Sequence, residues 1–310
     1  MRYYFAPMEG LTDSIYRRLH HRYFGGVDRY YMPFLSPTIH RCLTKKEERE
    51  LPFAGDIPAV PQVLTKNPED FLWAAEICRD RGYELIDLNL GCPSGTVVSK
   101  GKGAGMLADP DDLDRFLDII FYACPIKISI KTRLGLRSPE EFPELMAVYN
   151  RYPIRELIVH PRLRADFYKH DVRMEGFAYA LETSKNPICY NGNLNSKAEI
   201  EVFSERFPQV EAVMVGRGLI GDPGMLSGST PAQLEAFFEE LLRAYTEAFG
   251  SERNAMFRLK ENWRYLLRHF EGSEKLGKKL RKTTDLSEYR RITHEIFTTL
   301  PFLPQLDPDW

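Results

Sequence analysis

Short apolar runs alternate with amphipathic stretches along the first 225 residues of the chain. Each run is followed by a loop that begins with a polar residue, and then by a segment with helical periodicity. The runs predict eight strands, at residues 3–6, 29–32, 59–64, 85–90, 126–131, 157–160, 188–190 and 212–215. Eight strands alternating with helices are typical of an α/β fold of the (β/α)8 TIM barrel type, and a doubly wound open sheet is the alternative.

Capping residues support the helices expected between these strands. Asn67 and Asp109 each precede a proline and two acidic residues, a combination typical of a first helical turn. Gly82 is well placed to end the first of these helices. The segment 29–32 is open to a second interpretation, because Tyr30 and Tyr31 would also suit a loop.

The pattern changes between residues 225 and 233, where small residues, threonine and proline replace the alternation. We therefore predict a barrel domain at 1–226 and a small C-terminal helical domain at 227–310. Within the second domain, residues 254–270 place apolar positions on one helical face and a basic stripe beside it. The basic stripe consists of Arg253, Lys260, Arg264 and Arg268.

Charge is distributed unevenly along the chain. The net charge is −2, but residues 253–291 hold 12 Lys and Arg against 5 Asp and Glu, a balance of +7 that leaves −9 for the remainder. A basic face is most often solvated surface. Here a basic stripe and a dense basic cluster accompany an acidic body, which favours contact with the backbone of a nucleic acid.

Composition argues against several classes of protein. No apolar run is long enough to span a bilayer, and no signal peptide is recognisable at the start of the chain. The five cysteines are scattered and odd in number, and no two form a Cys-x-x-Cys pair, which argues against a disulfide framework or a zinc site. We expect a cytoplasmic protein without a metal ion or membrane contact.

Polar residues and glycines follow seven of the eight predicted strands. Because a barrel gathers the carboxyl ends of its strands at one mouth, we expect these residues to surround a common site. Each also has an ordinary explanation: Gln62 could cap a helix, Lys131 could pair with a surface carboxylate, and His160 could lie in the core. The residues at the strand ends are Pro7, Met8, Glu9, Gln62, Asn89, Cys92, Lys131, Arg133, His160, Arg162, Asn191, Gly192, Asn193, Gly216, Arg217 and Gly218.

Residues 85–94 are the most informative stretch. An apolar run ends at Leu90, Gly91 permits a turn, and Cys92 follows at once. This cysteine is either a small buried hydrophobe or a reactive group at the mouth, and taken alone the two are about equally supported. The segment 95–107 contains four glycines and two lysines, and we expect it to be a mobile loop that closes over the site. It lacks the spacing of a dinucleotide fingerprint.

The last two strand ends have the composition of a phosphate site. Gly192 and Gly216 offer exposed backbone N–H groups, and Arg217 adds a cation. Lys131 and His160 would then face the body of a phosphate-bearing ligand. Cationic and hydrogen-bonding side chains beside an apolar ring suit a flavin, whose reduced form carries negative charge near N1.

Six segments resemble the tRNA-dihydrouridine synthases, which are FMN enzymes with a barrel and a C-terminal helical RNA-binding domain. They are residues 6–10, 87–94, 131–135, 159–162, 191–193 and 215–218, and they stand in the family's order over nearly the whole chain. The Asn-x-Gly-Cys-Pro-Ser element is the specific part, whereas the Gly-Arg and Asn-Gly pieces are shared with other FMN barrels. Residues 163–168 depart from the family's usual pattern of Thr-Arg and a glutamine.

The resemblance implies a role for each residue of the site. Cys92 would be the catalytic proton donor. NADPH would reduce FMN, and the flavin would give hydride from N5 to C6 of a uridine while the cysteine protonates C5. The FMN-binding residues would be Pro7, Met8, Glu9, Gln62, Lys131, His160, Asn191, Gly192, Asn193, Gly216 and Arg217. Contacts to the substrate tRNA would come from Asn89, Arg162, Tyr168, Arg253, Lys260, Arg264 and Arg268.

The reaction also requires an acid on chemical grounds. Hydride addition to C6 builds enolate character at C5 and O4, and a thiol with a pKa of about 8.5 is protonated at neutral pH yet able to donate. The alternatives are another FMN barrel that acts on a free pyrimidine or small enone, and an RNA-binding protein without catalysis. The basic stripe argues against the first and the complete set of strand-end residues against the second. We expect a monomer.

Overall fold

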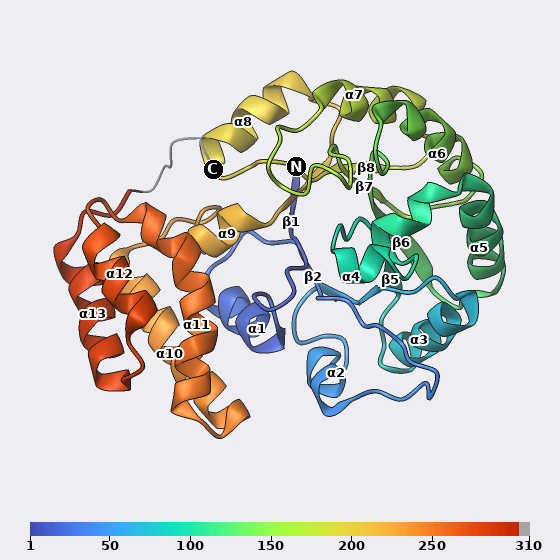
Figure 1. Ribbon diagram of the computed structural model, residues 1–310. Helices are drawn as coiled ribbons and strands as arrows, with labels where there is room; N and C mark the ends of the chain where they lie inside the picture. The colour runs from blue at the N-terminus through green and yellow to red at the C-terminus, as the bar shows by residue number, and fades with distance from the viewer. Residues whose placement is uncertain (304–310) are drawn as a thin grey trace. The chain divides into compact units, whose positions relative to one another are not determined.

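The computed structural model describes residues 1–303, and the last seven residues of the predicted helical domain lie outside this range. Nine strands form one parallel sheet in the order β3-β2-β1-β9-β8-β7-β6-β5-β4. The outer members of this order, β3 (Ala59–Val60) and β4 (Gln62–Val63), are separated in sequence by Pro61 alone. The sheet therefore curls into a nearly closed TIM-like barrel, as the alternation of apolar runs predicts (Figure 1).

The predicted strands are all present. The segment predicted as one strand at 59–64 is two, because Pro61 has no N–H to give to the ladder. Residues 29–31 are a strand, so the interpretation of Tyr30 and Tyr31 as a loop is wrong. The remaining strands are β1 (Arg2–Phe5), β2 (Arg29–Tyr31), β5 (Leu85–Leu90), β6 (Lys127–Arg133), β7 (Leu157–His160), β8 (Ile188–Tyr190) and β9 (Ala212–Val215).

Capping residues begin the barrel helices where the sequence predicts. The Asn67 side chain accepts hydrogen bonds from two N–H groups of the first turn of α3, and Asp109 accepts one from Asp112 of α5. The segment 95–107, expected as a mobile loop, contains a short helix and a 3-10 helix. The helices of this part are α2 (Lys45–Glu50), α3 (Pro68–Asp80), α4 (Gly95–Val98), η1 (Gly103–Ala108), α5 (Pro110–Ala123), η2 (Pro139–Glu141), α6 (Phe142–Tyr149) and α7 (Met174–Thr183).

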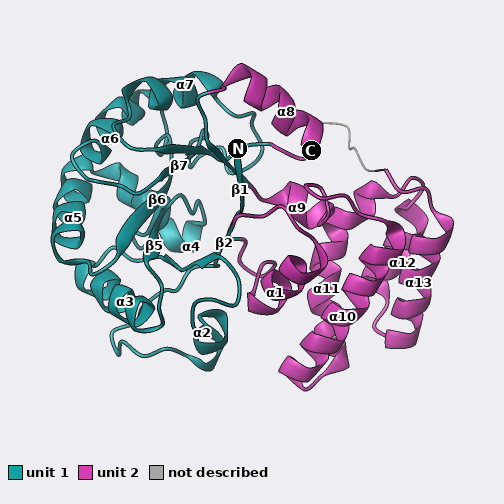
Figure 2. Cartoon of the chain, turned by 180° about the vertical axis from the view of Figure 1, so that it is seen from behind, with its two compact units in different colours: residues 1–7, 29–193, 209–214 teal, residues 8–28, 194–208, 215–310 magenta. Residues whose placement is uncertain are grey.

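The chain forms two compact units (Figure 2). The first, residues 1–7, 29–193 and 209–214, holds the barrel strands and α2 to α7. The second, residues 8–28, 194–208 and 215–310, holds α1 (Ser14–Tyr23), α8 (Lys197–Arg206), α9 (Arg217–Gly221) and the C-terminal helices. The chain passes between the units several times, whereas the sequence-based division placed one boundary at residue 226. That division stays a prediction.

Up to residue 303, four helices and a 3-10 helix make up the C-terminal part of the second unit. The apolar face predicted within 254–270 is buried, and Trp263 lies at its centre, with its indole N–H donating to the Tyr289 hydroxyl at 2.8 Å. Among residues 1–303 no helix is both long and apolar enough to cross a membrane. The elements are α10 (Pro231–Phe249), α11 (Glu252–Leu266), η3 (Leu267–His269), α12 (Glu274–Lys282) and α13 (Leu286–Thr299).

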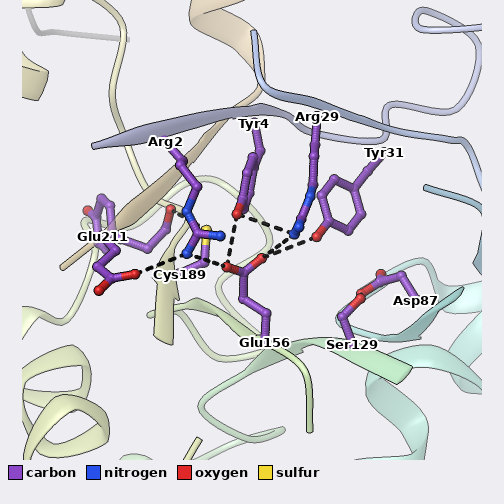
Figure 3. Close-up of polar contacts among 10 residues, drawn as sticks. Arg2, Tyr4, Arg29, Tyr31, Asp87, Ser129, Glu156, Cys189 and Glu211 are labelled. Atoms are coloured by element: carbon purple, nitrogen blue, oxygen red, sulfur yellow. Dashed lines mark hydrogen bonds and ion pairs between the residues drawn. The ribbon is translucent and has the colours of Figure 1, made fainter. Parts of the chain in front are cut away.

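A buried carboxylate closes the amino end of the barrel. Glu156 directly precedes β7, and its oxygens accept hydrogen bonds from the hydroxyls of Tyr4 at 2.9 Å and Tyr31 at 3.4 Å. The guanidinium groups of Arg29 and Arg2 lie 3.5 and 3.6 Å from the same carboxylate (Figure 3). Burial raises the pKa of Glu156, and its hydrogen bonds and the two arginines oppose the rise. The cluster thus surrounds the buried carboxylate with hydrogen-bond donors and positive charge.

Removal of this carboxylate is expected to destabilise the protein strongly. Glu156→Ala leaves buried tyrosine hydroxyls and the Arg29 guanidinium uncompensated, so the free energy of unfolding should fall by roughly 3–5 kcal/mol. Glu211→Ala is the matched control: this side chain also pairs with Arg2, but it is 82% exposed, and its loss should change the free energy by less than about 1 kcal/mol. Urea unfolding measures both, and equal effects would contradict a stabilising role for the cluster.

Candidate active site

Neighbouring strands place several predicted site residues side by side at their carboxyl ends. Gln62 of β4 lies opposite Asp87 of β5, and Asn89 of β5 lies opposite Lys131 of β6. Two residues further along β6, Arg133 lies opposite the last residue of β7. Because side chains alternate along a strand, residues 87 and 89 share one face, as do residues 131 and 133. The register therefore places these polar side chains next to one another on neighbouring strands.

Gln62 is fully buried, and both ends of its amide are engaged. Nε2 donates to Asp87 Oδ2 at 2.7 Å, and Oε1 accepts from Asn89 Nδ2 at 2.7 Å. The Ser129 hydroxyl donates to the other Asp87 oxygen at 2.7 Å. The sequence interpretation placed Gln62 at the cofactor and overlooked Asp87, whose only signal is a charged residue within an apolar run.

The loop that carries Cys92 is held by Asn89. Its Oδ1 accepts hydrogen bonds from the N–H groups of Gly91 at 3.1 Å and Cys92 at 2.9 Å. Cys92 is partly exposed, whereas Cys78 and Cys189 are buried. The thiol is therefore not fully buried in the core, and its role as a reactive group stays a prediction.

The 3-10 helix η1 packs directly on Cys92. The N–H of Ala104 donates to the Cys92 carbonyl at 3.1 Å. Gly103 has a φ of +58°, and a Cβ at this position would lie 3.0 Å from the Cys92 Cβ and 3.0 Å from Val97 Cγ1. Glycine is therefore required here both for its backbone conformation and for the close approach.

Lys131 stands beside this loop. Burial and the neighbouring Arg133 lower its pKa to about 8, while Asp87 opposes the shift. Within the described residues its ammonium group makes no hydrogen bond or ion pair. Burial raises the pKa of Asp87 to about 7, against the hydrogen bonds from Gln62 and Ser129 and the charge of Lys131. A partly buried cation in this position suits an anionic group of a ligand.

Arg133 joins two loops of the site. Its Nε donates to the Gly91 carbonyl at 2.8 Å, and Nη1 donates to the carbonyls of Leu163 at 2.9 Å and Phe167 at 3.0 Å. Its guanidinium also lies 5.3 Å from the centre of the Tyr168 ring. Arg133 is one of the polar residues at the strand ends, but the family resemblance assigned it no role.

Arg162 is also committed to bonds within the protein. It is 1% exposed, and its guanidinium lies 3.0 Å from His160 Nε2 and donates to Asn193 Oδ1 at 3.1 Å. It therefore connects the ends of β7 and β8, a role that the predicted contact with the substrate did not include. Tyr168 is 54% exposed, and its ring packs edge-on to His160 with the ring centres 6.0 Å apart.

The predicted phosphate residues are divided between the two units. Asn191 in the first unit donates from its side chain to the Met214 carbonyl at 2.8 Å, which fixes the end of β8 against β9. Gly216 and Arg217 lie in the second unit, where they begin α9. The first unit also contains Pro7, Gly192 and Asn193, and the second contains Met8 and Glu9. That both sets meet around one cofactor stays a prediction.

The basic stripe borders a groove in the second unit. The groove has a volume of about 590 Å³ and is lined by Lys260, Arg264 and Arg268, with Arg281 of α12 and the apolar ring of Trp263 among the other residues. Arg264 and Arg268 are exposed, while Lys260 is half-buried and donates to the carbonyl of residue 283. Arg253 is exposed, outside the groove, over the Phe257 ring.

A family model for dihydrouridine synthase (Dus) matches residues 4–300. The chain belongs to the dihydrouridine synthase family. As the resemblance implied, this family member is an enzyme, of the oxidoreductase class. Its relatives include tRNA-dihydrouridine synthase B of Pasteurella multocida (strain Pm70), which is 28% identical over 72% of this chain and 67% of that protein. A probable tRNA-dihydrouridine synthase of Staphylococcus aureus (strain COL) is 24% identical over 98% of this chain and 94% of that protein.

Solved structures share the barrel of this dihydrouridine synthase family member. A mutant of morphinone reductase in complex with tetrahydroNAD aligns with a TM-score of 0.53 at 10% identity, over 72% of this chain and 85% of that one. A 2-naphthoyl-CoA reductase complex gives a TM-score of 0.54 at 12% identity, over 72% of this chain and 48% of that one. At these identities the likeness concerns the fold alone.

A methyl group at position 103 is expected to disturb the cysteine loop. Gly103→Ala must place a Cβ in a left-handed conformation and against Cys92, so the free energy of unfolding should fall by roughly 1–3 kcal/mol. Gly95→Ala in the same segment is the control, because nothing lies within 4 Å of its Cβ position and its φ is not in the left-handed region. Urea unfolding of both variants tests this, and equal stabilities would contradict the close packing on Cys92.

Proposed function

We propose that this protein reduces specific uridines of tRNA to 5,6-dihydrouridine. The observation that carries the proposal is the partly exposed Cys92, whose loop is held by Asn89 and Arg133 beside the unpartnered ammonium of Lys131. The family match and the names of the relatives support this reaction and tRNA as its substrate. We also propose a cytoplasmic enzyme that acts as a monomer, as expected from the sequence.

The residues present fit FMN as the cofactor. The Lys131 ammonium, which has no partner among the described residues, suits the negative charge of a reduced flavin. Bound FMN would supply hydride from N5 to C6 of the uracil ring, after reduction by NADPH. The residues that would hold the ring are Pro7, Met8, Glu9, Gln62, Lys131 and His160, and those that would hold the phosphate are Asn191, Gly192, Asn193, Gly216 and Arg217.

Cys92 is proposed to complete the reaction. As C6 gains hydride, negative charge develops at C5 and O4, and the thiol transfers its proton to C5. The resulting thiolate regains a proton from solvent, which its partial exposure permits. Asn89 and Arg133 hold the backbone of the loop that carries the thiol. Asn89 binds the N–H groups of residues 91 and 92, and Arg133 binds the carbonyl of Gly91.

Removal of the thiol should separate flavin reduction from product formation. Cys92→Ala takes away the proton donor but leaves Lys131 and the proposed flavin contacts, so NADPH should still bleach added FMN at a rate close to that of the wild type. Dihydrouridine formed in tRNA, measured by mass spectrometry, should fall by at least about a hundredfold, the usual contribution of a positioned acid.

The wild type is the control for the whole proposal. It should bind FMN with a visible spectrum and form dihydrouridine in tRNA lacking this modification. Colourless protein that gains no flavin spectrum, or product on free uridine in preference to tRNA, would overturn the proposed function. Normal product from Cys92→Ala would remove only Cys92 from it.

The basic groove is expected to bind the tRNA backbone. Arg264→Glu with Arg268→Glu replaces two exposed cations by anions, so tRNA binding should weaken and the slope of log K against log salt should become shallower by about 2. Arg243→Glu with Arg291→Glu is the matched control, because these exposed arginines carry the same charge change outside the groove. Filter binding across a salt series measures the slopes, and equal slopes for the two double variants would reject the groove as the contact.

A further inference from the structure

A continuous line of hydrogen bonds runs from the barrel interior to the backbone of the cysteine loop. It begins at Ser129, passes through Asp87, Gln62 and Asn89, and ends at the N–H groups of residues 91 and 92, with all bonds between 2.7 and 3.1 Å. Asp87, Gln62 and Ser129 are 0% exposed, so water does not compete for these bonds. Asp87 has no part in the reaction as proposed above.

We propose that Asp87 is a positioning residue, whose carboxyl sets the orientation of the Gln62 and Asn89 amides and thereby holds the Cys92 loop. The inference rests on the proposed function for its consequence in catalysis, because the loop carries the proposed proton donor. The hydrogen-bonded line itself lies wholly within the first compact unit.

The direction of the line is fixed at both ends. The backbone N–H groups of Gly91 and Cys92 can only donate, and an ionised carboxyl group at Asp87 can only accept. An amide side chain has one accepting and one donating end. Two amides in series between these groups therefore have a single arrangement in which no donor faces a donor and no acceptor faces an acceptor. In that arrangement Gln62 donates towards Asp87 and Asn89 accepts from the loop, as observed.

The opposite orientation of the amides would break the loop contacts. If Gln62 were turned over, its nitrogen would face the nitrogen of Asn89, and Asn89 would have to turn as well. The Asn89 nitrogen would then face the two loop N–H groups, donor against donor, and the buried groups would lose their partners. Because Asp87 accepts a hydrogen bond, Gln62 and Asn89 are oriented so that the Asn89 oxygen accepts from the N–H of Cys92.

Ser129 makes this arrangement independent of the charge on Asp87. Its hydroxyl can donate or accept, so a protonated Asp87 can direct its proton to Ser129 and still accept from Gln62 through the other oxygen. In the variant Asp87→Asn the introduced amide has the same option, since its nitrogen can turn towards the Ser129 hydroxyl. With alanine at position 129 that option is lost, and one end of the introduced amide has no partner in the line whichever way it turns. The orientation of Gln62 and Asn89 is then fixed from the loop end alone.

This reasoning predicts a non-additive pair of substitutions. Asp87→Asn and Ser129→Ala should each leave the alkylation rate of Cys92 by iodoacetamide within about twofold of the wild type, and the double variant should raise it at least about fivefold. Peptide mass spectrometry follows Cys92 separately from Cys42, which is exposed and serves as the internal reference. Glu156→Gln is the control for a general loosening, because this buried carboxyl binds tyrosine and arginine side chains and has no bond to the line.

The alkylation assay needs neither FMN nor tRNA, so its outcome is separate from that of the proposed function. In single turnover, the double variant should also form dihydrouridine at least about fivefold more slowly, with the reduction of added FMN by NADPH unchanged. A double variant that alkylates at the wild-type rate, or a Glu156→Gln variant that alkylates equally fast, would overturn the positioning role. If the double variant does not fold, Gln62→Leu interrupts the same line of hydrogen bonds and must give the same rise in Cys92 alkylation. A wild-type alkylation rate in Gln62→Leu would also overturn the positioning role.

Discussion

Polar groups inside a closed parallel barrel must bind one another, because water does not reach them and an unpaired buried group is costly. This constraint organises the first unit at both of its ends. At the amino end Glu156 gathers two tyrosine hydroxyls and two arginines, and towards the carboxyl end Asp87 begins the line through Gln62 and Asn89. The first cluster closes the barrel, whereas the second extends out of it and terminates on the loop of Cys92.

The same constraint explains why buried arginines bind the loops at the mouth of the barrel. Arg133 extends from β6 and donates to carbonyls of the two loops that follow β5 and β7. Arg162 extends from the end of β7 and binds the His160 ring and Asn193. Both arginines are about 1% exposed, and a rigid planar donor with five N–H groups is well suited to bind several carbonyl and side-chain acceptors at once.

Much of this architecture could be predicted from the sequence, because buried parallel strands are short apolar runs with sharp ends. The strands at 85–90, 157–160, 188–190 and 212–215 have the predicted bounds, and the break at Pro61 follows from a missing N–H that the apolar pattern does not show. The partners of Gln62 could not be predicted, because a polar residue at a strand end has the same signal whether it faces a ligand or a neighbouring strand. Asp87 was overlooked for the related reason that its acceptor role depends on the register of β4, β5 and β6. The passage of the chain between two units depends on contacts distant in sequence, which local periodicity does not encode.

The two cations of β6 have different surroundings although they lie on the same strand. Lys131 and Arg133 are two residues apart on the same face of one strand, and burial lowers the pKa of both. Arg133 has three backbone carbonyls as acceptors, whereas Lys131 has no hydrogen-bond or ion-pair partner among the described residues. A guanidinium bound to these carbonyls fixes the loops, while a single ammonium on a flexible stem can follow a ligand. The site therefore divides its positive charge into one group that maintains the structure around Cys92 and one that remains for an anionic partner.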